Sequence, residues 1–205
     1  MRKNLLLAIT LFSLTNLYSQ EVYFLTGSNF TKYNFESRVG TMSTQLQSGT
    51  GTSYEIGYSI PFKKSQFSYS FGATLNAYNA AAGSNVNTYQ WDTKYLGGQC
   101  ALIYTCTLSK SFNISAKLGS NLSSIIYGKQ SSNGILYDIT NQKEFSGLLL
   151  STFAGIQTNY TFNNSGYLSL GYGYSNGINI TNSLSENLTL KTNQILFGVH
   201  FKIKN

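Results

Sequence analysis

Apolar and polar residues alternate along most of this 205-residue chain, and no other feature limits its possible folds as strongly. Successive side chains of a β-strand point to opposite faces, so a period of two predicts strands with one apolar and one polar face. The run near the C-terminus shows the pattern best, because Phe197, Val199 and Phe201 alternate with Gly198 and His200. The same pattern predicts eight strands, near residues 22–31, 53–60, 67–77, 99–108, 112–119, 148–162, 168–175 and 194–203.

The connections between these strands alternate strictly in length. Short polar turns lie at 63–66, 109–111 and 163–166. Long polar segments lie at 33–51, 79–91, 123–145 and 176–188. All long connections therefore emerge at one end and both termini at the other, an asymmetry typical of bacterial outer-membrane barrels with short periplasmic turns and longer external loops. We expect an all-β fold, an eight-stranded antiparallel up-and-down transmembrane β-barrel with four extracellular loops.

Periodicity alone leaves open whether the apolar face points outward to lipid or inward around a ligand, as in a soluble lipocalin-like barrel. Two observations favour the membrane. Only 10% of the residues are charged, and the polar faces hold mostly Ser, Gly, Thr, Asn and Gln, which suit a narrow barrel interior better than a surface in water. Aromatic residues also gather at both strand ends, as in the two girdles of a membrane barrel. Those beside the short turns are Phe62, Phe67, Phe112, Phe162, Tyr167 and Phe201, and those opposite are Tyr33, Tyr78, Tyr89, Trp91, Tyr127 and Tyr174.

Residues 1–19 have the features of a secretory signal peptide. Arg2 and Lys3 form a basic start, residues 5–14 form a short apolar stretch, and Ser19 offers a small residue before the cut. We therefore expect export, a barrel over residues 20–205, and both termini in the periplasm. After residue 19 no run approaches the ~20 apolar residues of a transmembrane helix.

The alternating connections and the last strand resemble the small eight-stranded outer-membrane barrels of the OmpA and OmpX kind. The resemblance covers residues 20–205 and implies an integral protein of the Gram-negative outer membrane, in contact with its lipids. The last strand is similar to the C-terminal signal read by the outer-membrane assembly machinery, and its signal residues would be Phe197, Val199 and Phe201. Family members usually end on an aromatic residue, whereas this chain ends Lys202-Ile203-Lys204-Asn205. Phe201 would therefore have to take the place of the terminal aromatic residue in the assembly signal.

The sequence predicts no catalytic, cofactor-binding or metal-binding residues. His200 is the single histidine, and its place in the last strand predicts an inward position near the short turns. Some barrels that the chain resembles are lipid-modifying enzymes, but their catalytic His and Ser sit near the extracellular side. The seven acidic residues are scattered, so neither a catalytic pair nor a metal cluster is expected. Cys100 and Cys106 share one strand face roughly 20 Å apart, too far for a disulfide.

Glu55 and Lys117 are the predicted polar pair of the barrel interior. Both fall on polar strand faces, and counting residues from the neighbouring short turns places them at similar heights. An uncompensated charge in a narrow interior would be costly, so we expect a structural contact between opposite walls. A gate or a proton path is the functional alternative. The net charge of +7 comes largely from residues at turns and termini, so no nucleic-acid partner is expected.

An eight-stranded barrel has an interior that side chains just fill, so a wide pore is not expected. The expected function is a structural or interaction role in the outer membrane, carried by loops whose partner the sequence does not identify. The alternatives are a minor channel or a transport or secretion-assembly accessory, a lipid-modifying enzyme, and a soluble lipocalin-like binding barrel.

Overall fold

The computed structural model describes residues 20–37, 46–63, 65–83, 88–163, 165–181 and 186–203, without the side chains of 35–37 and 186–187. The predicted signal peptide lies outside these residues. Every regular element within them is a β-strand. The strands are β1 (Gln20–Ser37), β2 (Leu46–Pro61), β3 (Phe67–Gly83), β4 (Thr88–Thr107), β5 (Phe112–Ser132), β6 (Ile135–Asp138), β7 (Leu148–Asn163), β8 (Gly166–Asn179) and β9 (Glu186–Ile203).

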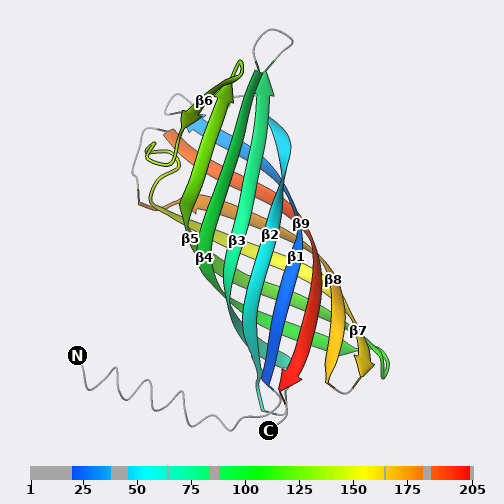
Figure 1. The fold of residues 1–205 in the computed structure, drawn as a ribbon. Coiled ribbons are helices and arrows are strands. Elements are labelled where there is room, and N and C mark those ends of the chain that lie inside the picture. The colour runs from blue at the N-terminus through cyan, green and yellow to red at the C-terminus, as the bar shows by residue number, and fades with distance from the viewer. Residues whose placement is uncertain are drawn as a thin grey trace, which may run out of the picture.

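Eight of these strands close into a barrel (Figure 1). Consecutive barrel strands pair antiparallel in the order β4-β3-β2-β1-β9-β8-β7-β5, and β4 also pairs with β5. The first and last strands join at the seam, where Gln20 lies opposite Ile203, so both ends of the barrel chain lie at the short-turn end. The predicted all-β, eight-stranded, antiparallel up-and-down barrel is confirmed.

The ninth strand, β6, is not one of the eight strands that close the barrel, and it continues the sheet beside β5 beyond the end of β7. It pairs only with the last residues of β5, from Lys129↔Asp138 to Ser132↔Ile135. Asn133 and Gly134 join the two strands, and both have positive φ angles, 49° and 84°. A two-residue hairpin turn with two positive φ angles matches the twist of its strands, and Asn-Gly is the preferred sequence for it. The β5–β6 hairpin therefore rises beyond the barrel at the long-loop end (Figure 1).

The strands extend well into all four segments predicted as long loops, so those predicted boundaries are wrong. β1 and β9 remain paired up to Ser37↔Glu186, and β3 and β4 up to Gly83↔Thr88. Backbone pairing continues there although the side-chain pattern of the barrel body has stopped.

The side-chain pattern stops there because, near the long-loop end, the apolar residues move from the outer face of the strands to the inner face. In the barrel body apolar side chains point outward, as Leu96 does on β4, with 52% of its surface exposed. The next residue toward the long-loop end, Tyr95, is buried inside, and Lys94 beyond it points outward. β9 changes in the same way, because its outward side chain is apolar at Ile195 and cationic at Lys191. We call this level the phase boundary and define it by Phe30/Lys32 on β1, Leu96/Lys94 on β4 and Ile195/Lys191 on β9.

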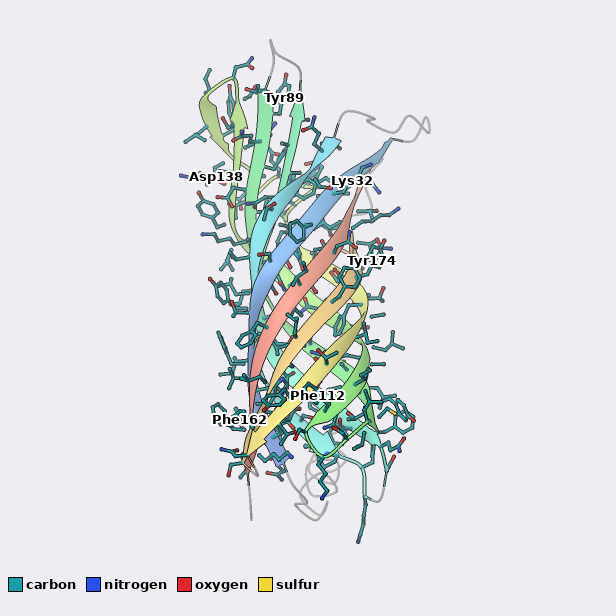
Figure 2. All side chains as sticks on the ribbon, turned by 90° about the vertical axis from the view of Figure 1, so that its right-hand side faces the viewer. Lys32, Tyr89, Phe112, Asp138, Phe162 and Tyr174 are labelled. Carbon is teal, nitrogen blue, oxygen red and sulfur yellow. The ribbon has the colours of Figure 1, made fainter. Side chains whose placement is uncertain are left out.

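The predicted aromatic girdles are only partly correct. Beside the short turns Phe62, Phe67, Phe112, Phe162 and Phe201 are exposed on the outer face, as predicted, and Figure 2 shows Phe112 and Phe162 at that end. Tyr167 instead points into the barrel and stacks on His200. At the long-loop end, Tyr33 and Tyr78 are buried inside and Trp91 packs beside them, so these three belong to no outer girdle. Outward-facing aromatic residues near the phase boundary are Tyr54, Tyr172 and Tyr174.

Candidate functional site

The barrel lumen is divided into layers of different chemistry. A cavity of about 380 Å³ begins at the short-turn end and is lined largely by polar side chains, including those of Glu21, Lys117 and His200. A smaller cavity of about 60 Å³, lined by both polar and apolar groups, follows between Glu55 and Tyr78. It has room for several water molecules beside Asn121, whose side chain is buried. Beyond it the lumen becomes apolar.

The structure brings the predicted pair, Glu55 and Lys117, together in the middle of the lumen. Lys117 Nζ lies 2.8 Å from Glu55 Oε1, and the same oxygen accepts a hydrogen bond from Tyr23 Oη at 2.6 Å. Gln99 Nε2 is a third donor to this atom. The ammonium also lies 5.4 Å from the centre of the Tyr23 ring and 5.5 Å from that of Phe153. Both charges are thus compensated, as burial in a low-dielectric interior requires.

Gly57 makes room for this arrangement. It lies next to the buried Tyr23 ring, and a Cβ atom at position 57 would stand 2.3 Å from Tyr23 Oη. No side chain fits there without moving that hydroxyl away from Glu55. The glycine is therefore needed for space, as expected where another group approaches a strand closely.

A second cluster, which the sequence did not predict, surrounds His200 at the short-turn end. Its Nδ1 lies 2.7 Å from Glu21 Oε1, and its Nε2 lies 2.9 Å from Ser169 Oγ. Tyr167 Oη donates to the same Glu21 oxygen at 2.5 Å, and the imidazole stacks on the Tyr167 ring at 4.2 Å between centroids. Glu21 and His200 are separated by 179 positions, and only the pairing of β1 with β9 makes them neighbours.

The order Ser169–His200–Glu21 is that of a serine hydrolase triad, in which an acid orients a histidine that activates a hydroxyl. The surroundings of the hydroxyl differ from those of a nucleophile. Ser169 is only 4% exposed, and it is not among the residues that line the 380 Å³ cavity. A Cβ at Gly198 would meet Ser169 Oγ at 2.3 Å and Leu25 Cδ2 at 2.4 Å, so the hydroxyl is enclosed by packed atoms. This geometry fixes the imidazole but leaves no room for a substrate.

Apolar side chains fill the lumen at the long-loop end, and we call this group the apolar plug. Tyr33 is its centre, fully buried, with its hydroxyl donating to the Tyr78 carbonyl at 2.7 Å. Ile139 and Phe145 enter from the segment between β6 and β7, and the others come from the strands. The plug consists of Tyr33, Leu46, Tyr78, Ala80, Tyr95, Ile125, Ile139, Phe145, Leu149, Leu188 and Leu190. These side chains pack against one another and close off the polar part of the lumen below them.

The β5–β6 hairpin carries an apolar surface outside the barrel. Ile135, Leu136 and Tyr137 are 60%, 64% and 49% exposed. Asp138 stabilises the end of the hairpin, because its carboxylate accepts a hydrogen bond from the Thr140 amide at 2.8 Å. This bond, together with the nearby Lys129 charge, lowers the pKa of the Asp138 carboxyl. The hairpin is therefore an ordered element that exposes the side chains of Ile135, Leu136 and Tyr137.

The remaining predicted residues lie on the outer surface. Phe197 and Phe201 are exposed on β9, and Val199 is half-buried between them. Their role as an assembly signal stays a prediction. Cys100 and Cys106 are exposed, unpaired thiols on the outer face of β4. Among the described residues no group of three or more acidic, His or Cys side chains could hold a metal ion, and no helix is long and apolar enough to cross a membrane.

No protein-family model and no curated protein matches the sequence. Among solved structures, the outer membrane protein OprG from Pseudomonas aeruginosa is 12% identical, with 91% of this chain and 97% of that one covered and a TM-score of 0.56. Neisserial surface protein A is 15% identical over 88% of this chain and 97% of that one, with a TM-score of 0.45. The attachment invasion locus protein of Yersinia pestis, solved with the heparin analogue sucrose octasulfate, is 12% identical over 90% and 100%, with a TM-score of 0.42. The predicted likeness to small outer-membrane barrels is thus confirmed at the level of the fold.

Proposed function

We propose that this chain is an integral β-barrel of the bacterial outer membrane and that its role is carried by contacts at its long-loop end. The change of apolar face carries the proposal. Between the short turns and the phase boundary, exposed side chains such as Phe71 and Leu96 face outward, an arrangement that acyl chains favour and water does not. Beyond the boundary, on β1, β4 and β9, the outward side chains of Lys32, Lys94 and Lys191 are cationic and the apolar plug packs inward, as in a protein surrounded by water. On β8 the outward face is still apolar at Ile178.

The same observation opposes a soluble lipocalin-like barrel. Such a barrel turns its apolar face inward along its whole length, to line a ligand cavity. Here the middle of the lumen holds the Glu55–Lys117 ion pair, and Phe197 and Phe201 are about half exposed on the outside. In water these outer faces would form a continuous apolar band and promote association.

The orientation in the membrane follows from the connections. Short turns and both ends of the barrel chain share one end, which in outer-membrane barrels faces the periplasm. We propose that residues 1–19 direct export and that the outward face of β9, with Phe197, Val199 and Phe201, is read during assembly. The long-loop end would then face the cell exterior.

The apolar plug disfavours the channel alternative. The 380 Å³ cavity gives solvent a way in from the short-turn end, and Lys117 and Glu55 meet at its inner limit. Above them the smaller cavity of about 60 Å³ ends at the plug, whose packed side chains fill the lumen. We therefore propose that the barrel is closed to solutes.

The enclosed Ser169 hydroxyl disfavours the lipid-modifying enzyme. A nucleophile must reach its substrate, and acyl substrates of an outer-membrane enzyme lie outside the barrel wall. Ser169 is buried on the inside, with its oxygen bonded to His200. We propose that the chain is not an enzyme and that the His200 cluster joins β1, β8 and β9 at the short-turn end.

The interaction role predicts that the β5–β6 hairpin touches a partner in the intact cell. A photoactivatable phenylalanine analogue at Leu136, which is 64% exposed, should give a reproducible protein adduct after irradiation of whole cells. The same analogue at Ile56, exposed at 58% on the body of the barrel, should give lipid adducts instead. Mass spectrometry of the purified adducts distinguishes the two products.

Equal protein adducts at both positions would contradict a specific contact at the hairpin. Lipid adducts at neither position would contradict membrane residence itself. A protein adduct at Leu136 alone, identified as the same protein in independent experiments, is the result that the proposed function requires.

A further inference from the structure

We propose that Lys32 and Lys191 form a binding site for the phosphate group of a lipid in the outer leaflet. The site lies on the outer wall of the barrel, across the seam between β1 and β9. This inference rests on the proposed residence in the outer membrane, and it adds a defined ligand chemistry at a defined place.

The two lysines are direct neighbours in the sheet. Lys32 on β1 is the register partner of Lys191 on β9, and both side chains are exposed on the outer face. Partners that face each other across an antiparallel pair have Cβ atoms only ~5 Å apart, and like charges in that position repel. Neither lysine has an acidic partner among the described side chains. An anion that bridges them would turn this repulsion into attraction.

Their height suits the phosphate layer of a membrane. Both lysines mark the phase boundary, because the outward face is apolar at Phe30 and Ile195 and cationic at Lys32 and Lys191. Figure 2 shows Lys32 on the long-loop side of Tyr174, far from Phe112 and Phe162 at the other end. Tyrosines and basic residues at such a boundary meet the headgroups, while the band below contacts acyl chains.

Polar groups beside the lysines complete the site. Asn176 on β8 is the register partner of Lys191, and it is exposed on the same face. Asn193 stands one outward position below Lys191 and accepts a hydrogen bond from Tyr172 Oη at 2.5 Å, which orients its amide. A phosphate between the ammonium groups would therefore have amide donors within the same patch. Below it the exposed faces of Tyr172 and Tyr174 offer contact to the chains of the same lipid.

A lipid phosphate is favoured over a soluble anion because the outward face becomes apolar below the two charges, at Phe30 directly under Lys32 and at Ile195 beyond Asn193 on β9. A free phosphate gains only the ammonium contacts, in full competition with water and salt. The acyl chains of a lipid hold its phosphate at this height. Each lysine near the membrane surface then raises the affinity for the lipid roughly fivefold.

The other basic pair at the phase boundary provides a matched control. Lys94 and Lys129 flank the Tyr127 ring on the far side of the barrel, at 5.0 Å and 5.6 Å from its centre. Lys129 lies opposite Asp92 and Asp138 on its two neighbouring strands, so its charge, unlike those of Lys32 and Lys191, stands between acidic residues. Removing this pair changes the protein's net charge by the same two units as removing Lys32 and Lys191.

The test compares the full-length mature protein with the double variants Lys32→Gln/Lys191→Gln and Lys94→Gln/Lys129→Gln. Each is refolded into phosphatidylcholine vesicles containing bisphosphorylated lipid A, and retained lipid A is counted by native mass spectrometry. We expect the first variant to bind about 25-fold more weakly than the parent protein. The second should stay within about twofold, since Lys129 stands between acidic residues and both lysines lie beside the Tyr127 ring. Lipid A stripped of its phosphates should be retained poorly by all three proteins.

Three outcomes would overturn the inference. Equal losses in both double variants would mean that only net charge matters, and equal retention of dephosphorylated lipid A would mean that the acyl chains suffice. Displacement of the lipid by inorganic phosphate alone would identify a site for the free anion. Membrane residence is read separately, from the mobility difference between boiled and unboiled samples on a gel. A protein that inserts but ignores the phosphate contradicts this inference and leaves the proposed function intact.

Discussion

At the residue scale, one carboxylate oxygen organises the middle of the lumen. Glu55 Oε1 accepts hydrogen bonds from Tyr23 and Lys117, and Gln99 also donates to it, so three strands besides its own depend on it. Removal of the carboxylate leaves the Lys117 ammonium beside the Tyr23 and Phe153 rings without its ion-pair partner. Removal of Lys117 alone still leaves Glu55 two donors.

Glu55→Ala should therefore cost more stability than Lys117→Ala. The expected loss for Glu55→Ala is about 3 kcal/mol, at the lower end for a broken buried pair because the adjoining cavity admits water to Lys117. The double variant should recover about 1 kcal/mol relative to the sum of the single losses. Urea unfolding of the refolded barrel in detergent measures all three. Additive losses would show that the two side chains do not stabilise each other in solution.

At the element scale, the β5–β6 hairpin has its own source of order. Asn133 and Gly134 form its turn, and Asn133 also ties it to β4, since its amide donates to the Thr88 carbonyl at 3.0 Å. A Cβ at Gly134 would meet no atom within 4 Å, so the glycine is required only by its φ of 84°. This makes the turn a place where backbone conformation can be changed without altering contacts.

Gly134→Ala should loosen the hairpin and leave the barrel unchanged. An alanine in the left-handed region costs about 1 kcal/mol, which corresponds to roughly fivefold faster amide exchange where opening is local. Hydrogen exchange followed by mass spectrometry should show the change in residues 129–138 and not in β7 or β8. Ser132→Ala, in regular strand conformation beside the turn, is the matched control and should have little effect. Unchanged exchange in both variants would mean that the turn does not limit opening of the hairpin.

At the scale of the whole molecule, the phase boundary divides a part made for lipid from a part made for water. The division is sharp on β4, where Leu96 and Lys94 occupy successive outward positions. A probe moved by one such step should therefore leave the hydrocarbon.

A fluorophore attached at Leu96→Cys, in a protein whose native cysteines are replaced by serine, should be quenched strongly by brominated acyl chains. The same fluorophore at Lys94→Cys should be quenched much less. Ala101→Cys, at a position 7% exposed on the inner face, is the control for a site inside the barrel. Refolding into liposomes of brominated lipid and steady-state fluorescence provide the measurement. Similar quenching at positions 94 and 96 would contradict the boundary, and none at 96 would contradict the membrane assignment.

The sequence was sufficient for the number of barrel strands and their pairing order because alternation and connection length are local signals, but it did not predict β6. The similar heights of Glu55 and Lys117 also followed from counting residues, since each residue adds a similar rise to a strand from its turn. Tyr33 and Tyr78 were assigned to the wrong face because the outward-apolar rule was applied along the full strand. The sequence does contain a sign of this change of face. On the last strand the apolar residues of the alternation stand at even positions at Leu188 and Leu190 and at odd positions from Ile195 to Ile203.

The His200 cluster could not be predicted in the same way. Glu21 and His200 lie on strands that meet only when the barrel closes, and their contact depends on the register of that closure. A register shift of one residue would turn either side chain to the opposite face. No local pattern in the sequence determines this register.

The seam between β1 and β9 has a kinetic consequence. Its first pair joins Gln20 to Ile203, so the barrel cannot close until the last strand of the chain has been made. Contacts between residues so far apart form slowly, because the intervening chain must be ordered before they are gained. Until then β1 exposes a free edge, and an open strand edge is a template for pairing with another chain. A chain that has not yet added β9 must therefore be prevented from associating with other copies of itself. A chain truncated before β9 should aggregate rather than fold into a smaller barrel.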